Sequence, residues 1–72
     1  MYSYNINKIN ALKRIYPIGT NLICLKMDDK QAVPEGTIGT VRGVDDMGHI
    51  LMNWNNGSTL SLISGIDEFE KI

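Results

Sequence analysis

The strongest constraint on the fold is a turn signal between two apolar segments, Asn55-Asn56-Gly57. Asn and Gly both tolerate a positive φ, so Asn-Gly between two apolar runs is the preferred tight turn of a β-hairpin. Residues 49–54 before the turn alternate apolar and polar side chains, and residues 58–63 after it form a second strand. The apolar face of the first strand consists of Ile50, Met52 and Trp54. The sequence therefore predicts a central antiparallel hairpin with positive φ in the Asn56-Gly57 turn.

Three further short strands are predicted around this hairpin, at residues 21–26, 37–44 and 69–72. The apolar residues of 37–44 do not share one parity. Gly39 and Gly43 therefore predict a β-bulge or sharp bend, of the kind that closes small barrels. The segment Asp45–Gly48 predicts a hairpin loop in which the final glycine takes a positive φ after a type I turn. About five short strands with regular turn signals favour a mainly β fold, a small SH3-like barrel.

An amphipathic helix is predicted ahead of the strands. Its apolar residues recur in steps typical of one helical face, and Pro17 ends the pattern. These apolar residues are Ile6, Ile9, Leu12, Ile15 and Tyr16. Residues 22–25 are all apolar, so both faces of that strand need cover, and we expect the helix to pack over Ile23 and Leu25. The expected organisation is a helix at 1–16 packed on a barrel at 17–72, and the alternative is a helix that docks on a partner.

The cysteine and histidine content limits the chemistry of the chain. Its 72 residues include one cysteine, Cys24, and one histidine, His49, so the chain can form neither an internal disulfide nor a zinc site of the Cys/His type. A lone His without a neighbouring nucleophile is weak evidence for catalysis, and a free Cys on an apolar strand usually acts as a small hydrophobe. We therefore predict no catalytic residue, no metal, no cofactor and no enzymatic activity.

The charge balance bears on partners and location. The formal net charge is −1, without the basic surplus that nucleic-acid binders usually carry, so binding to nucleic acid is disfavoured. The first residues lack the features of a signal peptide, and no apolar run approaches the length of a membrane span. We expect a cytoplasmic protein without a membrane association, as a monomer or a weak homo-oligomer.

A series of short motifs runs from Tyr16 to the C-terminus. These motifs are Tyr16-Pro17-Ile18-Gly19-Thr20, Met27-Asp28-Asp29, Pro34-Glu35-Gly36-Thr37-Ile38-Gly39-Thr40-Val41, Gly43-Val44-Asp45-Asp46-Met47-Gly48, Trp54-Asn55-Asn56-Gly57-Ser58 and Gly65-Ile66-Asp67-Glu68-Phe69. The series resembles family 4314 of the bacterial and phage domains of unknown function. The resemblance implies a compact β domain often carried on phages, plasmids and conjugative elements, and it implies no activity. Asn55 departs from the pattern, in which an acidic residue follows the tryptophan.

The candidate binding residues lie in loops and at one aromatic position. Two Asp pairs in polar loops are interpreted first as turn-formers, because Asp side chains accept hydrogen bonds from nearby backbone. Trp54 either fills the barrel or anchors a binding groove at its mouth. If the loop 27–36, the turn 45–48 and the edge of the tryptophan share one end of the barrel, they form an acidic surface for a basic protein partner. The candidate partner-binding residues are Trp54, Asp28, Asp29, Asp45, Asp46 and Met47.

These observations favour a small protein-binding adaptor or regulator encoded by a phage or mobile element. Inhibition of a host defence protein is one specific version of that role, and only the family resemblance suggests it. The alternative is a nucleic-acid-binding SH3-like barrel, because such folds often serve that purpose. Fold alone does not decide between the two.

Overall fold

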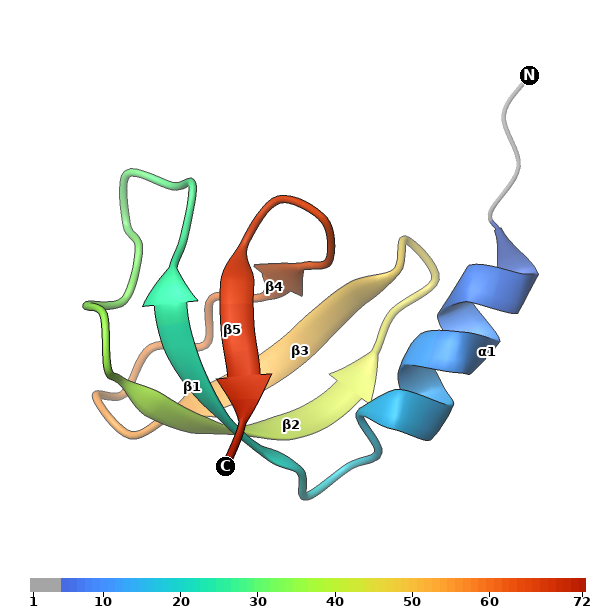
Figure 1. The fold of residues 1–72 in the computed structure, drawn as a ribbon, viewed down its shortest axis with the longest axis horizontal. Coiled ribbons are helices and arrows are strands. Elements are labelled where there is room, and N and C mark those ends of the chain that lie inside the picture. The colour runs from blue at the N-terminus through green and yellow to red at the C-terminus, as the bar shows by residue number, and fades with distance from the viewer. Residues whose placement is uncertain (1–4) are drawn as a thin grey trace.

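One helix and five strands follow one another along residues 5–72, which are the residues that the computed structural model describes (Figure 1). The elements are α1 (Ile6–Ile15), β1 (Asn21–Lys26), β2 (Ile38–Val44), β3 (His49–Trp54), β4 (Leu62–Ile63) and β5 (Glu68–Lys71). The predicted mainly β class, with its N-terminal helix, is confirmed. Residues 1–4 of the expected helical unit 1–16 lie outside the described residues.

The strands form one antiparallel sheet in the order β4-β3-β2-β1-β5. The first four strands follow each other as a meander, and the last strand returns to pair with β1, which is the arrangement of an SH3-like barrel. The sheet curls strongly, and a bridge between Ser64 and Asp67 lies between its two edge strands (Figure 1). The curl encloses one small core.

The expected bulge lies in β2. The register between β2 and β3 shifts between Val41 and Gly43, and Gly43 lies opposite Leu51. The extra residue changes which side of the sheet each later side chain faces, so Val41 on one side of the bulge and Val44 beyond it both contact the core. The mixed parity in the sequence is thereby explained.

The two hairpin turns around β3 have the same hydrogen-bond pattern. Gly48 N donates to Asp45 O at 3.0 Å, and Gly57 N donates to Trp54 O at 3.0 Å. The glycines have φ values of 80° and 92°, and no other residue type among 5–72 has a positive φ. The prediction for the first turn is confirmed. In the second turn only the glycine takes a positive φ. Asn56 does not, and its Oδ1 accepts a hydrogen bond from Ser58 N at 3.0 Å.

The strand after the second turn is shorter than predicted. The sequence indicated a strand at 58–63, but β4 spans Leu62–Ile63. Backbone groups of the intervening segment form hydrogen bonds with side chains. Trp54 Nε1 donates to Leu60 O at 2.8 Å, and Leu60 N donates to Ser58 Oγ at 3.1 Å. These groups are therefore not used in a strand ladder.

The core lies between the curled strands and one turn of the helix. Its buried members are Leu12, Leu22, Cys24, Val33, Val41, Ile50, Met52, Trp54 and Leu62. Tyr16, Met27, Val44 and Phe69 pack at its margin. Since a chain of this size buries only about 60% of the surface its unfolded form exposes, each of these side chains carries a large share of the stability.

The helix does not cover the outer face of β1, and that prediction is wrong. Ile23 and Leu25 stay half-buried on that face, while α1 packs against β2 and the turn 45–48. A Cβ atom at Gly48 would lie 4.0 Å from side-chain carbons of both Ile9 and Leu12. The connection to β1 explains this position, because Gly19 N donates to Val41 O and ties the end of the helix to β2.

Candidate protein-binding surfaces

The predicted site residues are divided between the two ends of β2. The acidic pair Asp28 and Asp29 lies in the loop that leads into β2, whereas Asp45, Asp46 and Met47 lie in the turn that follows it (Figure 1). In an antiparallel meander, the loop before a strand and the turn after it leave from opposite ends of that strand. The expected single acidic end is therefore wrong.

Trp54 belongs to the core. Its side chain is only 4% exposed, and its ring lies against Gly39, where a Cβ atom would be 2.5 Å from Trp54 Cε3. Because the indole N–H donates to Leu60 O, the polar atom of the ring is also satisfied within the chain. Of the two interpretations of this residue, barrel filling is the one that the structure supports.

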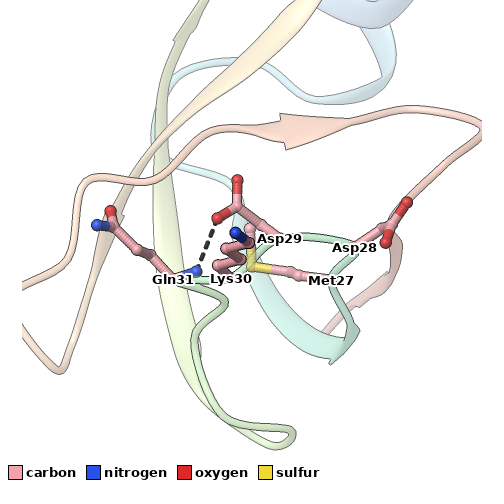
Figure 2. A pocket seen from close by; sticks show the side chains of 5 residues that line it. All are labelled: Met27, Asp28, Asp29, Lys30 and Gln31. Carbon is pink, nitrogen blue, oxygen red and sulfur yellow. Dashed lines mark hydrogen bonds between the residues drawn. The ribbon is translucent and has the colours of Figure 1, made fainter.

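The loop after β1 forms a shallow, open pocket (Figure 2). It is lined by Met27, Asp28, Asp29, Lys30 and Gln31. Asp29 Oδ1 accepts a hydrogen bond from Gln31 N at 2.7 Å, and the carboxylates of Asp28 and Asp29 point in different directions (Figure 2). The pair therefore does not converge on a common ligand position.

The second acidic pair also shapes its own turn. Asp45 Oδ1 accepts hydrogen bonds from Met47 N at 3.0 Å and from His49 N at 2.8 Å. Asp45 Oδ2 lies 3.5 Å from His49 Nδ1. Asp46 and Met47 stay exposed beside it. This is the turn-forming role that the sequence assigned first to the Asp pairs.

A buried carboxylate that sequence reasoning missed closes the barrel. Asp67 is 9% exposed, and its two oxygens accept hydrogen bonds from Asp28 N at 2.9 Å and from Ile63 N at 2.8 Å. It thus joins the loop after β1 to β4 at the point where the sheet is open. Its place two residues after Gly65, in a turn, is the sequence signal that could have indicated a backbone-binding Asp.

The one cysteine is buried, and the possible metal ligands do not cluster in the described part of the chain. Cys24 is fully buried, and its thiol donates to Val33 O at 3.8 Å. Burial, with the nearby charges of Asp67 and Glu35, raises the pKa of this thiol, which disfavours the reactive thiolate. No group of three or more His, Cys, Asp and Glu residues among 5–72 could hold a metal ion.

A groove that the sequence did not reveal lies where α1 meets the end of β2. We call it the helix-end groove, lined by Lys13, Tyr16, Pro17, Ile18, Gly43 and Val44. Among its apolar members, Ile18 is 77% exposed. Apolar groups of the segment that follows the helix, Tyr16, Pro17 and Ile18, and of Val44 in β2 therefore line one surface.

The backbone holds Ile18 rigidly in this exposed position. Thr20 N and Thr20 Oγ1 donate to Pro17 O at 3.0 Å and 2.6 Å, which closes a turn around Ile18 and Gly19. Gly19 N donates to Val41 O at 2.8 Å, and Val41 N donates to Thr20 O at 2.8 Å. An apolar residue between Pro and Gly is the sequence signal that could have indicated this exposed corner.

The fold defines a small SH3-like β domain with an N-terminal helix. The chain belongs to the family described as "Domain of unknown function (DUF4314)", whose model matches residues 5–72. The resemblance predicted from the motif series is thereby confirmed. No curated protein and no solved structure matches the chain. Residues 5–72 contain no helix that is long and apolar enough to cross a membrane.

Proposed function

We propose that this protein acts by binding another protein, as an adaptor or regulator, and that the helix-end groove is its docking surface. The observation that carries the proposal is Ile18, a large apolar side chain left 77% exposed on a turn that three backbone hydrogen bonds hold in place. Single exposed apolar residues are common on protein surfaces. Here the exposed residue lines one groove together with further apolar residues, Pro17 and Val44.

The rigidity of the groove favours binding. A surface that is already ordered loses little conformational entropy when a partner docks. Burying a side chain the size of Ile18 contributes roughly 1.5–3 kcal/mol to an interface. The neighbouring apolar groups of Tyr16 and Val44 extend the contact area for the same partner side chain. This combination is typical of a pocket that accepts one apolar anchor of a protein segment.

A protein partner fits this surface better than a nucleic acid. The groove lining is mainly apolar, and the chain as a whole carries a net charge of −1. Nucleic-acid binding draws most of its affinity from a basic surplus that neutralises phosphates. An apolar groove without that surplus favours side chains over phosphates.

Selection from a displayed random-peptide library tests the proposal. Peptides enriched on the wild-type protein should lose at least about tenfold in affinity for Ile18→Asp, because a carboxylate then replaces the apolar anchor contact. Ile66→Asp is the matched control, since Ile66 is also exposed, at 57%, but lies in the turn between β4 and β5. A failure to enrich any peptide, or equal affinity for both variants, would reject the helix-end groove as the docking surface.

A further inference from the structure

We infer that the segment held in the helix-end groove is acidic, with carboxylates that flank one bulky apolar side chain. The inference deepens the proposed function and rests on it. It starts from the charged side chains that line the groove or contact its lining, Lys13 and Lys71, which are cationic although the whole chain is slightly acidic.

Two cationic side chains lie at the groove and beside it. Lys13, in the last turn of α1, lines the groove. Lys71 lies on the edge strand β5, and its Nζ is 5.4 Å from the centre of the Tyr16 ring. The helix itself contains three basic residues and no acidic residue. The local charge is therefore opposite to the net charge of the chain.

The Lys71 ammonium is held near the groove by aromatic contacts. The Tyr16 ring meets the Phe69 ring edge-on, with centroids 5.5 Å apart and an interplanar angle of 63°. A cation over such a fixed ring face is attracted by the ring quadrupole. Since Tyr16 also lines the groove, this interaction positions a positive charge beside the apolar contact surface before any partner arrives.

The two side-chain carboxylates next to Val44 and Lys71 in the sequence are directed elsewhere. None of the groove-lining residues is acidic. Asp45 follows Val44, but its oxygens are engaged with the backbone and ring of its own turn. Glu70 precedes Lys71, yet it pairs with Ile23, whereas Lys71 pairs with Leu22. Successive strand residues face opposite sides of a sheet, so the Glu70 side chain points away from that of Lys71.

Apolar contacts and a positive rim together select an acidic peptide. A basic segment would be repelled by Lys13 and Lys71, and repulsion of this kind is an effective source of specificity. Nucleic acid would satisfy the cations but would leave Ile18 and Val44 facing a phosphate backbone. A peptide that carries an apolar anchor between carboxylates satisfies both parts of the surface.

The charge composition of the library-selected peptides tests the inference. We expect the enriched peptides to share an apolar anchor with flanking Asp or Glu, and to bind more weakly as salt rises. Lys13→Glu should lower their affinity by about tenfold, whereas Lys30→Glu, the same charge change in the loop before β2, should leave it unchanged. Thermal melting of both variants would verify that they remain folded.

The outcomes separate the inference from the proposed function. Peptides that need Ile18 but are neutral or basic would refute the acidic partner and leave the docking surface intact. Peptides that bind Ile18→Asp as well as wild type would reject the docking surface itself. Labelled mixed-sequence single-stranded and duplex DNA form a further arm. Sub-micromolar, salt-dependent DNA binding that competes with the selected peptides would assign the cations to nucleic acid and refute the acidic peptide.

Discussion

The two ends of β2 each place a glycine near a large apolar residue, which is buried at one end and exposed at the other. At its start, Gly39 packs under the buried ring of Trp54, and the loop that leads into the strand is tied down by Asp67. At its far end, Gly43 and Val44 line an open groove in which Ile18 remains exposed. The first end contributes to the stability of the domain, and the second presents apolar surface that the fold does not need.

The polar groups follow the same division. Every buried side-chain nitrogen and oxygen in residues 5–72 has a hydrogen-bond partner. The Trp54 indole is satisfied beside the start of β2, and the Asp67 carboxylate joins the loop that leads into β2 to β4. On the groove side, hydrogen bonds fix the backbone around Ile18 and leave its side chain free. A small domain thus separates the residues that hold it together from those available to a partner.

Removing Trp54 is the most severe test of this division. Trp54→Ala should lower the free energy of unfolding by about 3–5 kcal/mol, because it leaves a large cavity and an unpaired Leu60 carbonyl. A domain of this size has roughly 5 kcal/mol of stability in total, so the variant should be largely unfolded at room temperature. Urea denaturation followed by circular dichroism measures the change.

A milder variant at the same position distinguishes volume from hydrogen bonding. Trp54→Phe keeps most of the apolar contact but loses the indole N–H, and it should be less destabilised than Trp54→Ala. A near-wild-type midpoint for the alanine variant would show that the start of β2 is not the closed end.

Asp67 should have the next largest effect. Asp67→Ala leaves the backbone N–H groups of Asp28 and Ile63 without their acceptor and should cost about 2–3 kcal/mol. Asp67→Asn retains one acceptor oxygen and should lose less. Glu68→Ala is the matched control, because that carboxylate is exposed. Equal midpoints for the Asp67 and Glu68 variants in thermal denaturation would contradict a closing role.

Gly57 offers a smaller and more local test. Its φ of 92° lies in a region that β-branched residues rarely enter, so Gly57→Val should cost roughly 1–2 kcal/mol. Asn55→Val, in the same turn but without a positive φ, should cost clearly less. If chemical denaturation gives the two variants the same stability, the turn geometry is misassigned.

The sequence predicted the elements whose signals are local. The apolar run at 21–26 and the alternation at 49–54 match the bounds of β1 and β3, and the mixed parity between Gly39 and Gly43 predicted the bulge. Each of these signals depends on neighbouring residues only. The family motifs have the same local character, and the match over residues 5–72 confirms them.

The missed features depend on contacts between distant segments. The apolar stripe of α1 indicated a buried face, but its position beside β2 is set by the hydrogen bond from Gly19 to Val41. The predicted strand at 58–63 was shortened because the Trp54 indole takes the Leu60 carbonyl. The division of the acidic residues could have been predicted, since consecutive connections of a meander alternate between its two ends.

Ile18 should give the smallest change in stability of the four positions. Because its side chain is 77% exposed, Ile18→Ala removes few contacts and should alter the free energy of unfolding by less than about 0.5 kcal/mol. Ile9→Ala is the matched control. Ile9 is also an isoleucine, but it is only 4% exposed and packs against the turn 45–48, so its truncation should lower the free energy of unfolding by about 2 kcal/mol or more. Both variants are compared by urea denaturation. A large loss for Ile18→Ala would mean that this residue supports the fold, and the end of β2 would then be as closed as its start. A small loss, together with weaker binding of selected peptides, would assign Ile18 to a partner, because its side chain would then contribute to binding and not to the stability of the fold.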